Sequence, residues 1–139
     1  MTSIEVIENK ISFIQQHLGY LERYKKFSKD EIVAQQDLRG AVERFMFLVV
    51  QATIDLAEAT ISLKHLRKPT SMAEVFEILL EVSLIKPDLC RCLVQMVGFR
   101  NILVHGYQKL NYDILYAALQ NGDKDVQALV SSVKKAVGL

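Results

Sequence analysis

Residues 41–56 read AVERFMFLVVQATIDL, and the spacing of apolar residues in and around this stretch predicts one long helix. The helix is expected to begin near Asp37 and to end at Lys68 and Pro69. From 45 to 50 every residue is apolar, which indicates contacts on more than one side, either at the centre of a bundle or at a subunit interface. The apolar residues at helical spacing are Leu38, Val42, Phe45, Val49, Ala52, Leu56, Leu63 and Leu66.

Three polar residues lie near one side of this apolar helix. Arg44, Gln51 and Asp55 stand at positions i, i+7 and i+11, which places them close to a common face. Gln51 and Asp55 either form a buried polar network that fixes helix register or support a functional site, and the sequence leaves both alternatives open.

Amphipathic helices are also predicted before and after this stretch. Between Ile4 and Leu21 apolar residues recur at steps of three and four, which is typical of a helix with one narrow apolar seam. Ser28 and Ser71 each stand three residues before a glutamate, so each is expected to open a helix with a capping box. Two further helices are therefore predicted to start near these serines.

The C-terminal half continues the helical pattern. Pro87 fits the first turn of a helix that runs to His105, with Gly106 as its C-cap. Shorter helical patterns follow over 111–119 and 123–137. No stretch alternates apolar and polar residues in the manner of a strand. We therefore expect an all-α bundle of four long helices with one or two short ones, in a single domain over residues 1–139.

Composition limits the classes of function. Half of the 139 residues are apolar and 24% are charged, which is ordinary for one folded domain. The net charge of +1 excludes a uniformly basic surface, so nucleic acid would bind a local patch.

The side chains of Cys90 and Cys92 point apart on a helix, so they are not expected to form a disulfide or a metal site. We expect both cysteines to be small buried apolar residues of a protein in a reducing compartment. Without a signal sequence or an uninterrupted apolar span, the protein is expected to be cytoplasmic, with no membrane contact.

Residues 97–107, VGFRNILVHGY, place an Arg, a His and a Tyr in an otherwise apolar segment. An imidazole can take up and return protons near neutrality, and a guanidinium can bind a phosphate through two parallel hydrogen bonds. The two side chains suit the attack of an RNA 2′-hydroxyl on its own phosphodiester. His105 would act as general base or acid, and Arg100 would stabilise the charge on the phosphorus. The two converge only if the helix ends or distorts between them, because five residues are about 140° of rotation.

Each of these residues also has a purely structural alternative. Arg100 can pair with an acid such as Asp55, and His105 can cap the helix C-terminus, where a cation is favoured. Asn101 can serve as a hydrogen bonder at the helix end, and Tyr107 can be a packing residue with its hydroxyl at the surface. By spacing alone, the Arg and His pair is a weak motif.

The chemistry suggested for this segment requires neither a metal nor a cofactor. His17, His65 and His105 are far apart in the sequence and lack carboxylates at ligand spacing, so no metal site is predicted. We expect His17 and His65 to be exposed residues on helices.

The segment resembles the motif of the HEPN superfamily and, within it, the HepT toxins of bacterial and archaeal toxin–antitoxin pairs. That motif is an Arg, a polar residue, three variable residues, a His, one residue and a Tyr. Arg100, Asn101, His105 and Tyr107 fit it without departure. The similarity spans roughly residues 36 to 119 and includes 41–44, 54–57, 71–80 and 96–99.

The resemblance implies the toxin of a type VII-like toxin–antitoxin pair, a homodimeric and metal-independent endoribonuclease. The Arg100 and His105 pairs of two subunits would face each other in one composite RNA site, with Asn101 orienting them and Gln51, where relatives often carry Glu, in support. It also implies a cognate MntA-like nucleotidyltransferase antitoxin that attaches AMP to Tyr107 and blocks RNA by bulk and like charge. The alternative is a non-catalytic binding module that serves as partner and modification substrate of that nucleotidyltransferase.

Overall fold

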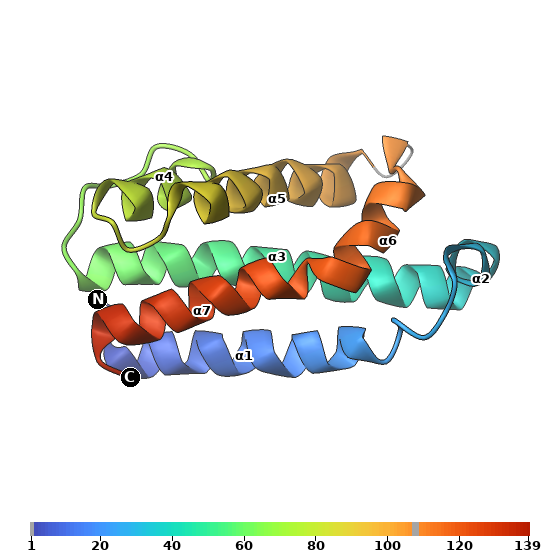
Figure 1. Ribbon diagram of the computed structural model, residues 1–139, viewed down its shortest axis with the longest axis horizontal. Coiled ribbons are helices and arrows are strands. Elements are labelled where there is room, and N and C mark those ends of the chain that lie inside the picture. The colour runs from blue at the N-terminus through green and yellow to red at the C-terminus, as the bar shows by residue number, and fades with distance from the viewer. Residues whose placement is uncertain (1, 107–108) are drawn as a thin grey trace.

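The computed structural model describes residues 2–106 and 109–139, and these form a helical bundle. Figure 1 shows α3 between α5 and α1, with α7 lying across α1 and α3. Four long helices, α1, α3, α5 and α7, are accompanied by three shorter ones where one or two were expected, and the predicted all-α bundle is confirmed. The helices are α1 (Ile4–Glu22), α2 (Lys29–Ala34), α3 (Gln36–Leu63), α4 (Glu74–Glu81), α5 (Pro87–His105), α6 (Tyr112–Asn121) and α7 (Asp123–Val137).

Helix α3 is the centre of the bundle, as its apolar pattern predicted. It packs against α1, α2, α4, α5 and α7, so buried side chains occur around most of its circumference. Within the apolar run, Met46, Val49 and Val50 are buried, whereas Phe47 and Leu48 stay partly exposed. By length and composition α3 is apolar enough to cross a membrane, but 61% of its most apolar window is buried inside the protein. That burial is what the core helix of a bundle shows.

Helix α3 ends at Leu63, earlier than the predicted end at Lys68 and Pro69. The chain turns because His65 adopts a left-handed conformation with φ of 54°, and the Leu66 amide then donates to the Ile61 carbonyl over 3.0 Å. This six-to-one bond satisfies a carbonyl that the helix end would leave free. A local turn therefore ends the helix before the proline is reached.

The two predicted capping boxes have different outcomes. At α2 the Ser28 hydroxyl accepts from the Glu31 amide and the Glu31 carboxylate accepts from the Ser28 amide, so this box is confirmed. At α4 the Ser71 hydroxyl does accept from the Glu74 amide, over 3.2 Å. The Glu74 carboxylate, however, accepts from the Thr70 amide rather than from Ser71. The prediction is therefore wrong for the second bond of the capping box, from the Ser71 amide to the Glu74 carboxylate. The helix itself begins only at Glu74.

The expectation that His17 is an exposed residue is wrong. Its ring is half-buried, stacks on Phe13 with the ring centroids 3.9 Å apart, and meets the edge of Tyr20. Phe45 of α3 completes this aromatic cluster between α1 and α3. His65 is exposed as predicted, but it lies in the turn after α3 rather than on a helix. The histidine of α1 is therefore a packing residue.

The two cysteines lie on α5 as separate packing residues. Cys90 is buried as predicted, and burial raises the pKa of its thiol. Cys92 is only half-buried, and both cysteines are free.

Candidate functional site

Arg100 is held between α5 and α3 by neutral side chains. Its Nε donates to Gln51 Oε1 over 2.9 Å, and its Nη1 donates to Asn101 Oδ1 over 3.0 Å. Gln51 Nε2 in turn donates to Asp55 Oδ1 over 3.0 Å. The structure thus brings four of the candidate residues together in one chain of hydrogen bonds, which we call the Arg100 network.

The structural alternative, in which Arg100 pairs directly with Asp55, is not what the structure shows. Gln51 stands between the two, and among the described residues Arg100 takes part in no ion pair. Arg100, Gln51 and Asp55 are all half-buried, so the network is only partly shielded from water. The guanidinium is therefore oriented without being neutralised, and part of it remains available to an anion.

His105 does not lie beside Arg100 within one chain. Helix α5 includes both residues without interruption, and the Gly106 amide closes it by donating to the Ile102 carbonyl over 2.9 Å. The helix neither ends nor distorts between Arg100 and His105, so the condition for their convergence is not met and the two side chains leave the helix about 140° apart. His105 is exposed in the last turn of α5, and Gly106 is the C-cap as predicted. A site that uses both groups at one phosphate needs a second source for one of them.

Tyr107, the candidate modification residue, lies outside the described residues. Its neighbour Gly106 is described, and it follows directly on the end of α5.

The surroundings of the Arg100 network are amphipathic. A groove of about 380 Å³ between α1 and α3 is lined by Gln51 and Asp55 together with Phe13, Leu48 and other residues of the two helices. Beside it, desolvation raises the pKa of Glu58 and the neighbouring Asp55 charge adds to that rise. The acidic end of the network therefore lies away from Arg100, beyond Gln51.

Phe47 is a residue of this site that the sequence reasoning missed. Its ring centroid lies 5.7 Å from Arg100 Cζ, within cation–π range of about 6 Å. The signal was available, because Phe47 falls four residues before Gln51 on the face that carries the polar stripe. The guanidinium therefore has an aromatic neighbour in addition to its two amide acceptors.

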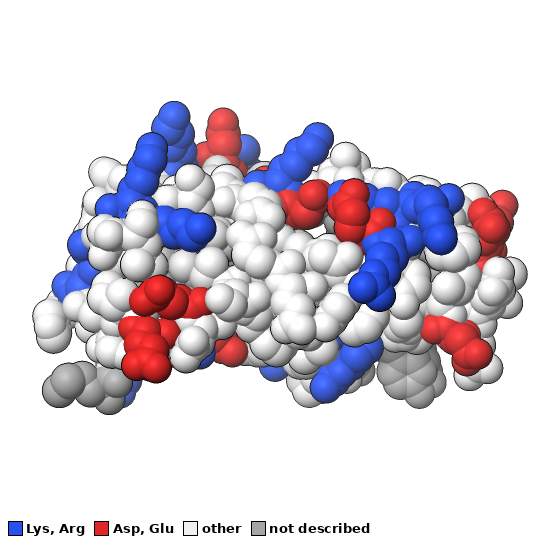
Figure 2. Space-filling model, turned by 90° about the horizontal axis from the view of Figure 1, so that it is seen from below, with Lys and Arg blue, Asp and Glu red and all other residues white. Residues whose placement is uncertain are grey.

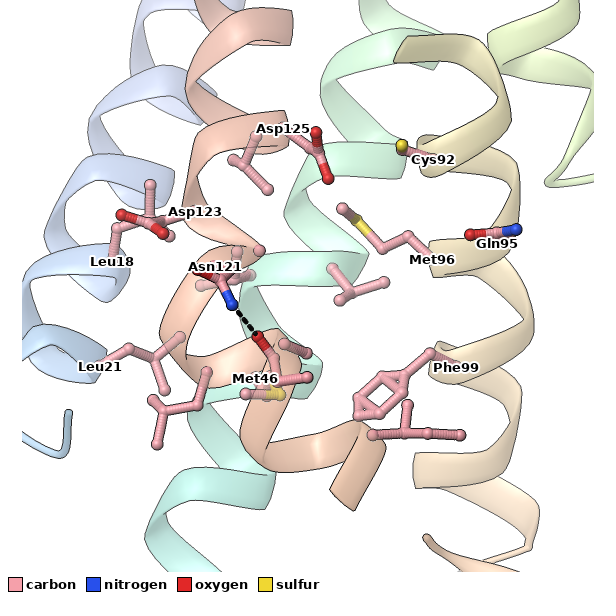
Figure 3. A pocket seen from close by; sticks show the side chains of 18 of the residues that line it. Leu18, Leu21, Met46, Cys92, Gln95, Met96, Phe99, Asn121, Asp123 and Asp125 are labelled. Carbon is pink, nitrogen blue, oxygen red and sulfur yellow. Dashed lines mark hydrogen bonds between the residues drawn. The ribbon is translucent and has the colours of Figure 1, made fainter. Parts of the chain in front are cut away.

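A separate, mostly apolar cavity of about 380 Å³ is lined by residues of α1, α3, α5, α6 and α7. Figure 3 shows Met46, Met96 and Phe99 on its walls, with Leu18 and Leu21 on α1 and Asp123 and Asp125 near α7. None of the candidate site residues that the structure describes lines this cavity. Its apolar walls belong to the core, and it has no place in the chemistry of Arg100 and His105.

The face of the molecule that carries α1, opposite α5, bears charged side chains of both signs (Figure 1 and Figure 2). Figure 2 shows acidic and basic side chains interspersed over the face that carries α1, so this face is not a uniformly basic surface. Within the described part of the chain, no three His, Cys, Asp or Glu side chains are grouped closely enough to hold a metal ion.

Two curated proteins are similar to this chain in sequence over most of its length. The chain is 27% identical over 121 residues to the tRNA nuclease HepT of Aphanizomenon flos-aquae, covering 86% of this chain and 82% of the relative. It is 31% identical over 132 residues to the mRNA nuclease HepT of Shewanella oneidensis, covering 94% and 97%. Both alignments include nearly the whole of each protein.

Solved structures of toxin–antitoxin systems are similar to this chain in fold. A toxin–antitoxin structure with AMP-PNP matches with a TM-score of 0.87 at 27% identity, covering 94% of this chain and 98% of its own. The tri-AMPylated Shewanella oneidensis HEPN toxin, in complex with an MNT antitoxin, matches with a TM-score of 0.86 at 29% identity, covering 97% and 99%. The family model for HepT-like ribonucleases matches residues 14–133. The chain therefore belongs to the HepT-like ribonuclease family.

Proposed function

We propose that this protein is a toxin endoribonuclease that cleaves RNA in the cytoplasm without a metal ion. The observation that carries the proposal is the Arg100 network, in which amide oxygens orient a guanidinium and leave its charge for a phosphate. His105 would remove the proton from a 2′-hydroxyl or return one to the leaving 5′-oxygen. The relatives called tRNA and mRNA nucleases support RNA as the substrate class.

The site is proposed to be complete only in a homodimer. Within one subunit α5 is continuous, so His105 points away from Arg100, and a second α5 would supply the partner group. Exposed apolar residues of α5 support such an interface, because Ile102 and Val104 are 39% and 38% exposed. Phe47 and Leu48 of α3 are also apolar and only half-buried.

Cleavage by the purified protein tests the proposal. Wild type is expected to cut RNA in the presence of a chelator and to leave cyclic-phosphate ends, because the attacking oxygen belongs to the RNA itself. His105→Ala removes the proton carrier and is expected to abolish cleavage. Retained cleavage in this variant would contradict the assignment of His105. Absence of cleavage by wild type, with unaltered binding of a nucleotidyltransferase, would favour the non-catalytic binding module instead.

The partner is proposed to be an MntA-like nucleotidyltransferase antitoxin that attaches AMP to Tyr107. The complex of a tri-AMPylated HEPN toxin with an MNT antitoxin supports this class of partner. Tyr107 follows His105 closely in the chain, with only Gly106 between them, so the added phosphates would repel RNA from the site. Coexpression with such an enzyme is expected to add AMP-sized mass increments, and Tyr107→Phe is expected to lack them. The same increments on the variant would place the modification on another residue.

A further inference from the structure

Arg44 is the member of the polar stripe that the Arg100 network does not include. It is exposed on α3, one turn before Phe47 and two turns before Gln51. Its Cζ lies 5.6 Å from the centroid of the Phe47 ring, and Arg100 Cζ lies 5.7 Å from the same centroid. One aromatic ring therefore supports two guanidinium groups, which come from two different helices.

The two guanidinium groups carry like charges on one ring and repel each other unless something compensates them. Arg100 is bonded to neutral amide oxygens, and Arg44 makes no hydrogen bond or ion pair with any residue that the structure describes. The negative face of Phe47 offsets only a small part of this repulsion. Lys25, by contrast, is paired with both Glu22 and Asp123. The pair of arginines on Phe47 thus has room for an anion.

We propose that Arg44 is a second phosphate-binding residue, which holds a backbone phosphate of RNA next to the one held by Arg100, with Phe47 setting the separation of the two guanidiniums. The inference rests on the proposed ribonuclease function. A polynucleotide suits the arrangement because it presents successive negative charges along one strand. A guanidinium also presents a flat fork of donors that fits a phosphate. Arg44 would then help to set where the strand lies relative to His105.

The test measures RNA binding separately from cleavage. Arg44→Ala is made in the His105→Ala background, and affinity for a short labelled single-stranded RNA of mixed sequence is measured by fluorescence anisotropy between about 50 and 200 mM salt. The matched control is Arg23→Ala in the same background. Arg23 is also exposed and also lies over an aromatic ring, with its Cζ 5.5 Å from the Tyr20 centroid. It lies at the end of α1, on the other side of α3 from α5 (Figure 1).

Arg44→Ala is expected to weaken RNA binding about 3- to 10-fold and to reduce the slope of log affinity against log salt by about 0.7 for each phosphate that the protein no longer neutralises. Arg23→Ala is expected to leave both unchanged. In otherwise wild-type protein, Arg44→Ala should raise KM more than it lowers kcat, and Arg44→Lys should recover part of the loss. Size-exclusion chromatography should give the same oligomeric state for all variants.

Three results would overturn the inference. Equal effects of Arg44→Ala and Arg23→Ala would show a general charge effect. An unchanged salt slope would show that Arg44 binds no phosphate, and dissociation of the oligomer would assign Arg44 to a protein interface. These failures differ from failure of the proposed function, in which wild type neither cleaves nor binds the RNA.

Discussion

Two arginines lie against the bundle in opposite electrostatic surroundings. Arg67, in the loop after α3, donates to Glu81 through Nε over 3.0 Å and Nη2 over 2.6 Å, and to Glu74 through Nη1 over 3.0 Å. These bonds lower the pKa of Glu81, and at Glu74 they add to a lowering that comes first from the Thr70 amide. Arg100 instead donates only to the amide oxygens of Gln51 and Asn101 within the described chain.

The difference separates a structural arginine from one that is available for chemistry. A carboxylate both orients a guanidinium and cancels its charge, whereas an amide oxygen orients it and leaves the charge in place. Arg67 joins the loop after α3 to both ends of α4 and has little charge left for a ligand. Arg100 has its orientation fixed in advance, so little reorganisation is needed when an anion arrives.

Removing Arg100 should impair RNA cleavage, whereas removing Arg67 should impair thermal stability. Arg100→Ala is expected to lower kcat for RNA cleavage by about 10²- to 10³-fold, because charge on the phosphorus loses its stabilising partner. Its thermal unfolding temperature should stay close to that of wild type. Arg67→Ala is expected to leave cleavage unchanged and to lower the unfolding temperature by a few degrees, because exposed ion pairs contribute modestly to stability.

Steady-state cleavage and differential scanning fluorimetry on the same preparations measure both effects. Two outcomes would contradict this prediction. One is loss of cleavage in Arg67→Ala with an unchanged oligomeric state, and the other is unfolding of Arg100→Ala at a much lower temperature than wild type. Either outcome would show that charge compensation does not distinguish the roles of the two residues.

Most of the fold could be predicted from the sequence because apolar spacing records which helix faces are buried. The run from 45 to 50 correctly placed α3 at the centre of the bundle. The end of α3 could not be predicted, since the left-handed turn at His65 is a local choice that no glycine or proline marks. The burial of His17 could not be predicted either, because its partner Phe45 belongs to another helix and the pairing depends on how α1 packs on α3.

The candidate site was predicted in its parts but not in its geometry. The stripe of Arg44, Gln51 and Asp55 follows from helical spacing alone. The bond from Arg100 to Gln51 depends on the packing of α3 against α5, which spacing within one helix does not define. Convergence of Arg100 and His105 within one chain required the helix to end or distort between them, but residues 101–104 contain no helix breaker. The helix therefore continued, and local propensity prevailed over the assumed mechanism.

A smaller effect should follow when the Arg100 network is made to resemble the Arg67 cluster. Gln51→Glu places a carboxylate on Arg100 Nε, and Asp55→Asn in the same protein restores the donor that the glutamine amide provided. The guanidinium stays oriented but loses part of its net charge. KM for RNA is therefore expected to rise about 3-fold, with kcat changed less and with an unfolding temperature equal to or above that of wild type.

The single variant Asp55→Asn is the matched control. It changes the outer residue of the network but leaves the neutral amide on Arg100, so its KM should stay close to that of wild type. Cleavage kinetics at two salt concentrations separate the alternatives, since a charge effect shrinks as salt rises and a packing defect does not. A KM in the double variant that equals the control would mean that the carboxylate does not weaken anion binding. Arg100 would then owe its role to position alone, and the contrast with Arg67 would carry no functional meaning.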